Sequence, residues 1–479
     1  MSTLAGGPDP IALLGGPGPR TSPAAPFLVV DASDDPVRVE AYRALRRRAF
    51  VDDQGLFSRH DLDDHDLAPR TRVLVALRHD GAVAGGVRIH SATDDPDLGW
   101  WQGSRLVAVG GAGVPRARVG AALVRAACAR VLHEGALRFD AHVQERHRGF
   151  FARLGWEQVG TMTVRGTPHA VMRHDITRLA DHATAHKAPI GDLVGALLPA
   201  GAWRGDDGVP VGDTGAVACL DAITPSMVER DPGWAGWCGA LVTAHDLSAM
   251  GAAPLGMLNS LAAPDRAHAA RVLEGLAAGG RAMGLPILGG HTQLGVPAAL
   301  GVTGLGRTAH PVPGSGMRPG HAIALTADTA GGWRPGYGGT QWDSTSWRDP
   351  ADLRAMLGAV PTARPAAAKD VSMAGIVGSV GMMAEAGGCG AELDVAAIGR
   401  PSGVTAGDWL TCFPGFAMVS AGPPGVAPPS GGPARGAVCG RAERAAGVRL
   451  RWPDGVVTTA LAGPVTDLGG ASEETTTWA

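Results

Sequence analysis

The sequence predicts a protein of α/β and α+β class with more than one domain. Its 479 residues are too many for one ordinary hydrophobic core. Short apolar strands alternate with helical stretches on both sides of a polar segment, residues 179–189, which we interpret as a linker. We therefore expect an N-terminal domain over residues 27–178 and a larger C-terminal region over residues 190–463.

The ends and the composition of the chain exclude several protein classes. Residues 1–26 are rich in Gly, Pro and Ala and lack the basic and apolar segments of a signal peptide, so we expect a disordered tail, and a second tail over residues 464–479. No uncharged apolar run is long enough for a membrane helix. A net charge of −3 without a basic patch gives no support for nucleic-acid binding. Six scattered cysteines without a C-x-x-C pair predict neither disulfides nor a zinc site, and favour a cytoplasmic setting.

The N-terminal region alternates strands with Arg-rich helices. The turn Asp80-Gly81 separates two runs that read as paired strands, and Tyr42, Leu45 and Phe50 are among the apolar positions of the first helix. We expect strands over residues 27–31, 71–77, 82–89 and 105–109, and helices over residues 37–50 and 119–133. This order predicts a mixed sheet with helices.

A series of loose motifs follows the same order as these elements. They are Arg46-x-x-x-Phe50-Val51-x-Asp53-Gln54-x-x-Phe57, then Asp63 and Asp66, then Gly85-Gly86-Val87-Arg88, and finally the segment Phe150–Trp156. Together they resemble a subgroup of the GNAT superfamily of N-acetyltransferases. The resemblance implies acetyl-CoA as cofactor, with Arg116, Arg118 and Gly120 at a helix N-terminus that receives its pyrophosphate. It makes Asp53 a candidate base, with His142 as the other candidate.

One position of this region leaves two functions open. Many members of that superfamily protonate the leaving thiolate with a tyrosine, and Phe151 stands at the corresponding place. Either water, Cys128 or a substrate group replaces the tyrosine in acetyl transfer, or the domain binds an acyl-CoA without turning it over.

The C-terminal region repeats the alternation of strands and helices with more glycine and proline. We expect strands over residues 217–220 and 297–306 and helices over residues 234–248 and 267–283. A Pro/Gly break at residues 311–319 divides the region into subdomains over residues 190–312 and 313–463.

Several aspartates of this region are candidate metal ligands. Mg²⁺ prefers carboxylate oxygens, and the chain has no G-x-x-x-x-G-K-[ST] phosphate loop that would hold a nucleotide differently. Asp206 and Asp207 lie in a Gly-flanked loop, Asp221 follows a strand, and Asp246 lies in a helix. The alternative is an ordinary Asp-Gly turn and a charge on a helix face.

The order of these segments carries a second resemblance. Gly205-Asp206-Asp207-Gly208, Asp221, the segment Val242–Pro254 and Ile287-Leu288-Gly289-Gly290-His291-Thr292 resemble the aminoimidazole ribonucleotide (AIR) synthetase superfamily, which includes thiamine-monophosphate kinase and selenophosphate synthetase. The resemblance implies Mg²⁺ and ATP as cofactors, with Asp206, Asp207, Asp221 and Asp246 around the metal. It also implies a homodimer formed through the sheet of the first subdomain.

Two further segments refine this resemblance. Gly289, Gly290 and Thr292 match a glycine-pair loop that binds ligand, and His291 in it is a candidate base, a phosphate or metal contact, or a buried histidine. Asp370 and Ser372 match a motif of the second subdomain, in which Met373 replaces an aspartate of the kinases. This replacement argues against thiamine-monophosphate kinase activity.

The two resemblances together imply a bifunctional metabolic enzyme. One region would activate a small metabolite with Mg-ATP, and the other would transfer an acetyl group from acetyl-CoA to an amine. The alternative is a regulatory or sensor protein that binds a nucleotide or an acyl-CoA without catalysis. The expected partners are a small-molecule substrate and a second copy of the chain, with neither nucleic acid nor membrane.

Overall fold

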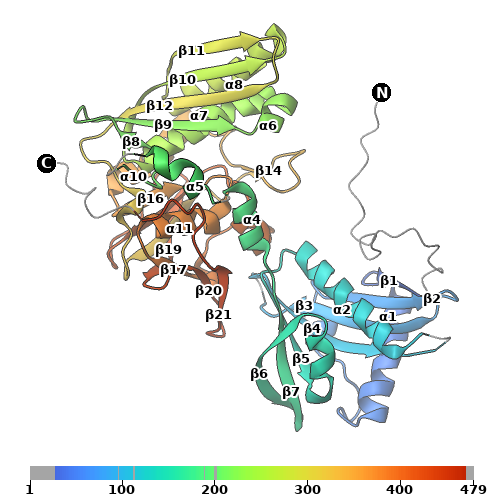
Figure 1. Ribbon diagram of the computed structural model, residues 1–479. Coiled ribbons are helices and arrows are strands. Elements are labelled where there is room, and N and C mark those ends of the chain that lie inside the picture. The colour runs from blue at the N-terminus through green and yellow to red at the C-terminus, as the bar shows by residue number, and fades with distance from the viewer. Residues whose placement is uncertain (1–26, 95, 112–113, 188, 199–201, 471–479) are drawn as a thin grey trace. The chain divides into compact units, whose positions relative to one another are not determined.

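The computed structural model describes residues 27–94, 96–111, 114–187, 189–198 and 202–470 (Figure 1). These residues form two compact units; the division falls between Ile176 and Thr177, and the short segment Thr405–Gly407 groups with the first unit. The expected tail over residues 1–26 lies outside the described residues, as do residues 471–479 of the second tail. No helix in the described ranges has both the length and the hydropathy to cross a membrane.

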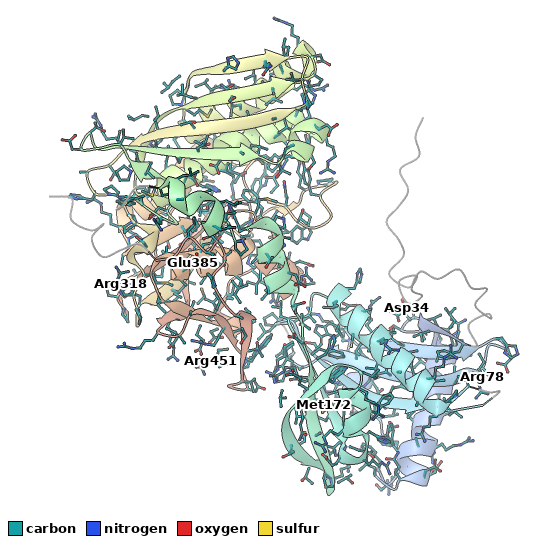
Figure 2. All side chains as sticks on the ribbon, viewed as in Figure 1. Asp34, Arg78, Met172, Arg318, Glu385 and Arg451 are labelled. Carbon is teal, nitrogen blue, oxygen red and sulfur yellow. The ribbon has the colours of Figure 1, made fainter. Side chains whose placement is uncertain are left out.

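A seven-stranded sheet forms the N-terminal unit, with the strand order β1-β2-β3-β4-β5-β7-β6. Helix α2 packs on β3 and β4, where Leu123, Phe139 and Met172 are fully buried; Met172 is labelled in Figure 2. The strands are β1 (Phe27–Asp31), β2 (Arg72–Arg78), β3 (Val83–Ser91), β4 (Trp100–Ala108), β5 (Arg138–Gln144), β6 (Trp156–Val164) and β7 (Thr167–His174), and the main helices are α1 (Pro36–Arg47), α2 (Arg116–His133) and α3 (Arg148–Ala152).

Strands β4 and β5 part from each other in the middle of this sheet. They are the one parallel pair, and their pairing covers only Trp100–Gly103 against Arg138–Ala141. Both strands continue beyond it, β4 to Ala108 and β5 to Gln144, without pairing to each other. Their outer sides stay paired with β3 and β7, so the backbone groups on the sides that β4 and β5 turn toward each other face an opening instead of a partner strand.

Two large sheets form most of the C-terminal unit, with the orders β11-β10-β12-β9-β8 and β16-β18-β13-β19-β17-β20-β21, beside the short pair β14 (Gly332–Trp333) and β15 (Trp342–Asp343). The first consists of β8 (Val209–Pro210), β9 (Ala216–Ile223), β10 (Ala253–Ala263), β11 (Ile287–Leu294) and β12 (Ala299–Arg307), and the second of β13 (Ala322–Ala327), β16 (Ala367–Asp370), β17 (Gly390–Asp394), β18 (Ala417–Gly422), β19 (Arg435–Glu443), β20 (Gly447–Arg451) and β21 (Val457–Leu461). One hydrophobic cluster contains residues of both subdomains, from Val217 to Ala434. The two subdomains therefore share a core.

Helices α7 (Pro232–Ala249) and α8 (Arg266–Met283) cover one face of the five-stranded sheet (Figure 1). Asp231 caps α7 and Pro232 occupies its first turn, as at many helix starts. The helices touch almost backbone to backbone, since a Cβ atom at Gly236 would clash with Val272 and one at Gly275 with Gly233. Helix α7 is apolar on all sides and buried, so its one acidic side chain, Asp246, is buried with it.

The opposite face of this sheet is apolar and uncovered within the described chain. Alternation along β9 turns Val217 and Cys219 toward α7, while Leu220 points away and is 73% exposed. Leu258 on β10 and Leu288 on β11 are exposed in the same way. A bare apolar sheet face of this kind favours contact with another surface.

Three segments differ from the sequence expectation. Residues 178–186 form helix α4 instead of a linker, because Leu179 and Ala183, one turn apart, are buried together. The expected glycine-pair loop is strand β11, which pairs in parallel with β10. Residues 464–470, expected as part of a tail, are held by the carboxylate of Glu385 at the end of α11 (Gly375–Ala386), which accepts N–H groups of Val465, Thr466 and Leu468 (Figure 2).

Candidate functional site

A cavity of about 260 Å³ in the C-terminal unit gathers the aspartates singled out in the sequence. Helix α7 contributes Cys238, Val242 and Asp246, which lie four residues apart and so share one helix face. Strand β9 contributes Asp221, and β16 contributes Asp370 at its last position. The polar and charged lining residues are Lys187, Asp206, Asp207, Asp221, Thr224, Asp246, Gln341, Lys369, Asp370 and Ser372.

Three carboxylates converge closely enough to hold one metal ion. Oxygens of Asp207, Asp246 and Asp370 all lie within 4.8 Å of one another. Asp221 adds a buried oxygen, Oδ2, that has no hydrogen-bond partner in the described structure. A set of carboxylate oxygens from a loop, a strand and a helix suits a hard dication such as Mg²⁺.

Four carboxyl groups of this cavity have pKa values raised above their usual range. Burial raises the pKa of Asp246 well above its ordinary value, and the neighbouring Asp221, Asp207 and Asp370 raise it further. Burial likewise raises the pKa of Asp370 and Asp221, and raises that of Asp206 to about 7. The cavity therefore concentrates negative charge where water solvates it poorly, which is an arrangement that a bound cation would relieve.

Lys369 compensates part of this charge. Its ammonium group forms an ion pair with Asp207, whose other oxygen accepts the N–H of Asp370 at 2.7 Å. Burial alone would lower the pKa of Lys369, but Asp207 and Asp370 outweigh it and raise the pKa. Five carboxylates still face only two ammonium groups, which leaves an excess of three negative charges when all are ionised.

Two neighbouring groups make contacts that support the surrounding structure. Asp206 accepts the N–H of Gly314 through Oδ1, so it joins its loop to the start of the second subdomain. Burial lowers the pKa of His245 to about 3, so its ring is neutral, and it packs edge-on against Phe416 with ring centroids 5.2 Å apart. His245 adds no charge to the cavity.

The segment Gly289-Gly290-His291-Thr292 lies elsewhere. It belongs to the exposed edge strand β11, and none of its residues lines the cavity. A Cβ atom at Gly290 would lie 2.6 Å from Asn259, so this glycine is needed for the packing of β11 on β10. His291 is exposed and pairs in register with Ser260. Within one copy of the chain, these residues do not join the aspartates.

Among the polar and charged lining residues, sequence reasoning missed Lys187, Thr224, Gln341 and Lys369. Gln341 lines the cavity, and its Oε1 atom accepts a hydrogen bond from the Trp234 indole at 2.8 Å, so its amide N–H groups are not used in this bond. Lys369 directly precedes the candidate ligand Asp370, and this adjacency is the sequence signal that could have identified it. Gln341 lies in an aromatic loop whose position depends on tertiary contacts.

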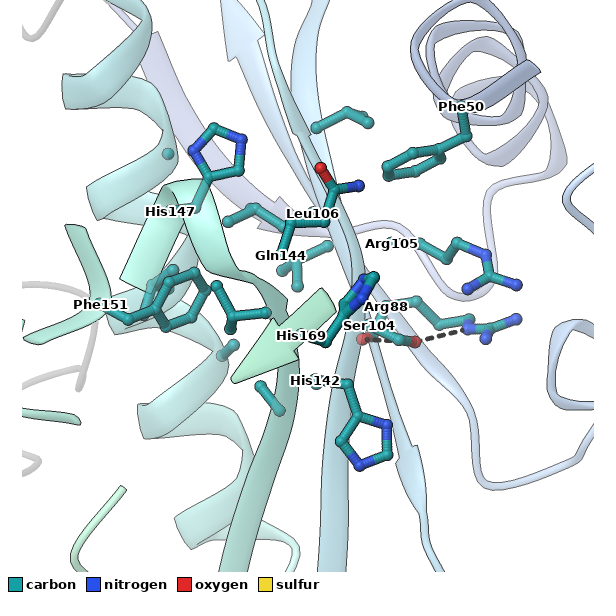
Figure 3. Close-up of a pocket in the computed structure, with 18 of the residues that line it drawn as sticks. Phe50, Arg88, Ser104, Arg105, Leu106, His142, Gln144, His147, Phe151 and His169 are labelled. Atoms are coloured by element: carbon teal, nitrogen blue, oxygen red, sulfur yellow. Dashed lines mark hydrogen bonds between the residues drawn. The ribbon is translucent and has the colours of Figure 1, made fainter. Parts of the chain in front are cut away.

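A second cavity, of about 590 Å³, lies in the N-terminal unit where β4 and β5 part (Figure 3). Its lining includes Ser104–Ala108 of β4 and His142–Gln144 of β5. Figure 3 shows His169 and Gln144 between Arg105 on one side and Phe151 on the other. The N-terminus of α2 also borders the cavity through Arg116, Ala117 and Gly120, and its first N–H groups have no side-chain cap.

The other candidates of this unit lie outside the cavity lining. Asp53 ends the π-helical turn that continues α1, and its side chain is exposed. Arg118 is exposed on α2. Asp63 and Arg88 of the motif series do line the cavity, and with Asp66 they form an ion-pair network with Arg46, so these positions also serve the packing of the unit.

Comparison with known proteins places the C-terminal unit in a family. Residues 205–308 match the model of the AIR synthase related protein N-terminal domain, and residues 338–427 match that of the C-terminal domain. An uncharacterized protein of Synechocystis sp. is 32% identical over 222 residues, covering 45% of this chain and 69% of the relative. The PurL subunit of phosphoribosylformylglycinamidine synthase from Nostoc punctiforme is 31% identical over 217 residues, covering 39% of this chain and only 27% of that subunit.

Solved structures are more distant. Thermotoga maritima PurL complexed with ATP has a TM-score of 0.49 at 16% identity, covering 61% of this chain and 53% of that one. A ThiL protein complexed with AMPPCP and TMP has a TM-score of 0.41 at 17% identity, covering 53% of this chain and 89% of that one. On the sequence matches to both of its domains and to the Synechocystis relative, the chain belongs to the AIR synthase-related family.

Proposed function

We propose that the C-terminal unit binds Mg-ATP and transfers its terminal phosphoryl group to an oxygen of a small metabolite. The convergence of Asp207, Asp246 and Asp370 carries this proposal, because carboxylates with oxygens within 4.8 Å of one another repel each other when ionised, and a bound dication would offset that repulsion. Membership of the family supports it, since curated relatives include PurL synthase subunits. Asp206 and Asp221 complete the proposed metal and nucleotide site.

In this reaction the bond between the terminal phosphorus and the bridging oxygen breaks, and a bond from phosphorus to the metabolite oxygen forms. ADP leaves, and the proton of a hydroxyl acceptor passes to a base. When bound, Mg²⁺ would neutralise phosphate charge, and Asp207, Asp246, Asp370 and Asp221 would hold it. The Gln341 amide is placed to donate a hydrogen bond to an acceptor oxygen of the metabolite.

Nucleotide binding tests this proposal directly. We expect Mg-ATP at 100 times its dissociation constant to stabilise the protein by about 2.7 kcal/mol, seen as a rise in melting temperature. Asp370→Asn should lose this rise, whereas the exposed Asp213→Asn should keep it. A metabolite screen for ADP release then identifies the substrate. A wild-type melting temperature that Mg-ATP leaves unchanged would contradict the proposal.

The bare sheet face suggests the partner of this unit. We propose that a second copy of the chain covers Leu220, Leu258 and Leu288. Leu220 also lines the acidic cavity, so a partner on this face would border the site. His291 and Thr292 on β11 would then lie at the same interface. A sedimentation mass of one chain at micromolar concentration would contradict this assembly.

The N-terminal cavity favours a second function, acetyl transfer from acetyl-CoA to an amine. The amine nitrogen would form a bond to the acetyl carbon while the carbon–sulfur bond breaks, coenzyme A would leave as its thiolate and take up a proton, and the amine proton would pass to a base. His142 lines the cavity and is the better placed base, since Asp53 is exposed outside it. The uncapped start of α2 with Arg116 and Gly120 offers N–H groups and charge to a pyrophosphate.

Acetyl-CoA binding checks this second function. We expect acetyl-CoA to raise the melting temperature of the full chain, and Gly120→Leu to abolish the rise by filling the cavity. Ala129→Leu on the exposed side of α2 is the matched control and should respond as the wild type does. Binding without acetylated product across an amine screen would favour a sensor, and absence of binding would reject acyl-CoA as the ligand.

A further inference from the structure

Both lysines of this chain lie at the same cavity. The sequence contains 42 basic Lys and Arg residues, of which only Lys187 and Lys369 are lysine. Although one precedes the five-stranded sheet and the other lies in the second subdomain, both line the acidic cavity. All the other basic residues are arginine. The ammonium group of a lysine side chain therefore occurs in this chain only where the five carboxylates meet.

The two ammonium groups are in different states. Lys369 is buried and forms an ion pair with Asp207. Lys187 is half-buried, and among the described residues no carboxylate oxygen lies within 4.0 Å of its ammonium group. Burial raises the pKa of Asp221 and of Asp370, and Lys187 is among the charges that oppose both rises. The Lys187 ammonium group therefore acts on the carboxylates of the cavity without forming an ion pair with any one of them.

Helix α4 holds Lys187 in this place. The backbone N–H of Lys187 bonds to the carbonyl of Ala183 at 2.8 Å and so continues the last turn of the helix. The His182 ring contacts the carbonyl of Met373, another cavity residue, at 2.9 Å, and Arg178 forms an ion pair with Asp408. These contacts of α4 hold the backbone of Lys187 in place, while its long side chain can still change conformation.

We propose that Lys187 binds the terminal phosphate of the nucleotide, the group that is transferred. This inference rests on the proposed phosphoryl transfer. A cavity with an excess of three negative charges repels a triphosphate, and an uncommitted ammonium at its edge provides the attraction that the carboxylates do not. Lysine is a compact, rotatable point charge that can follow a phosphoryl group as it moves, which the planar fork of arginine does less well.

The competing role is structural, in which Lys187 only screens the carboxylates. That role predicts an equal change in affinity for every nucleotide, because it acts on the whole cavity. Contact with the terminal phosphate predicts a loss confined to nucleotides that carry one. Comparison of a triphosphate with a diphosphate therefore separates the two roles.

Titration calorimetry with Mg-AMPPCP, a non-hydrolysable ATP analogue, and with Mg-ADP tests this proposal on the full chain. We expect Lys187→Ala to weaken Mg-AMPPCP binding by about ten- to a hundredfold, which is typical for a lost charge-assisted hydrogen bond, and to change Mg-ADP binding by less than about threefold. Lys187→Arg should recover part of the loss. Arg281→Ala, which removes an exposed charge from α8, is the control and should leave both affinities unchanged.

The outcomes separate this inference from the function on which it rests. Equal losses for the two nucleotides, or none, would overturn the role of Lys187 while leaving the nucleotide site in place. Wild-type protein that binds neither nucleotide would overturn both. Unchanged melting temperature of Lys187→Ala without ligand verifies that the variant is folded.

Discussion

Asp246→Asn is expected to stabilise the protein in the absence of metal and, at the same time, to reduce turnover by at least about a hundredfold. Asp246 is 6% exposed and lies among Asp207, Asp221 and Asp370, which repel its charge. Asparagine keeps the size of the side chain and removes that charge. We expect a gain of roughly 0.5–2 kcal/mol in the free energy of unfolding in EDTA, as for other relieved functional sites.

The stabilisation by Mg²⁺ should decrease in Asp246→Asn, although the metal-free variant should be more stable than the wild type. Binding to the native state raises the melting temperature of the wild type, and loss of one of the converging carboxylates should abolish most of that rise. Asp213→Asn, an exposed aspartate, is the control and should behave as the wild type in both buffers. Lower stability of Asp246→Asn in EDTA, or an undiminished Mg²⁺ effect, would contradict the assignment of Asp246 as a metal ligand.

The same repulsion fixes a pH dependence of the metal-free protein. Burial raises the pKa of Asp206 to about 7 and that of Asp246 well above its ordinary value, whereas both groups ionise near 4 in the unfolded chain. The folded state therefore binds more protons than the unfolded state between about pH 4 and pH 7, and stability falls as the pH rises through this window. Asp246→Asn should flatten this fall.

Local sequence patterns determined most of the elements that position the site. Asp231 and Pro232 at the start of α7, and Gly251 beyond its end, bound an apolar run, so the helix and its buried Asp246 were predictable. A short apolar run predicted a strand over residues 217–220 with Asp221 after it, whereas β9 continues to Ile223 and contains Asp221. These features depend on residues that lie close to one another in the sequence.

The parts that could not be predicted depend on residues far apart in the chain. Gly289-Gly290 is typical of a loop, yet it forms an edge strand because the backbone of β10 pairs with it and Asn259 fills the space next to Gly290. Helix α4 has only Leu179 and Ala183 to mark a buried face, and its stability comes from contacts with the second subdomain. The approach of Lys187 to Lys369 follows from that packing and not from any motif.

Arg46→Met is expected to cause the largest loss of stability in the N-terminal unit. The Arg46 side chain is 1% exposed, its Nε atom lies 2.7 Å from an Asp61 oxygen, and its Nη2 atom lies 3.0 Å from an Asp66 oxygen. Methionine has a similar length but no charge, so the variant leaves the carboxylates of Asp61 and Asp66 buried without the Arg46 guanidinium group. Removing one member of a buried ion pair costs about 3–5 kcal/mol. Arg38→Met on the same helix breaks only an exposed pair with Asp35 and should cost less than about 1 kcal/mol.

The pH dependence distinguishes this charge effect from loss of packing. Burial alone would raise the pKa of Asp66, but the hydrogen bonds from Arg46 and the charge of Arg88 outweigh it and hold the pKa below its usual range. In Arg46→Met that pKa rises, so Asp66 takes up a proton as the pH falls and the deficit against the wild type shrinks toward pH 4–5. Hydrogen exchange of peptides from α1 and β2 measures the deficit within this unit, separately from the rest of a two-unit chain. A deficit that stays constant between pH 7 and pH 5 would show that lost packing, and not the stranded carboxylates, causes it.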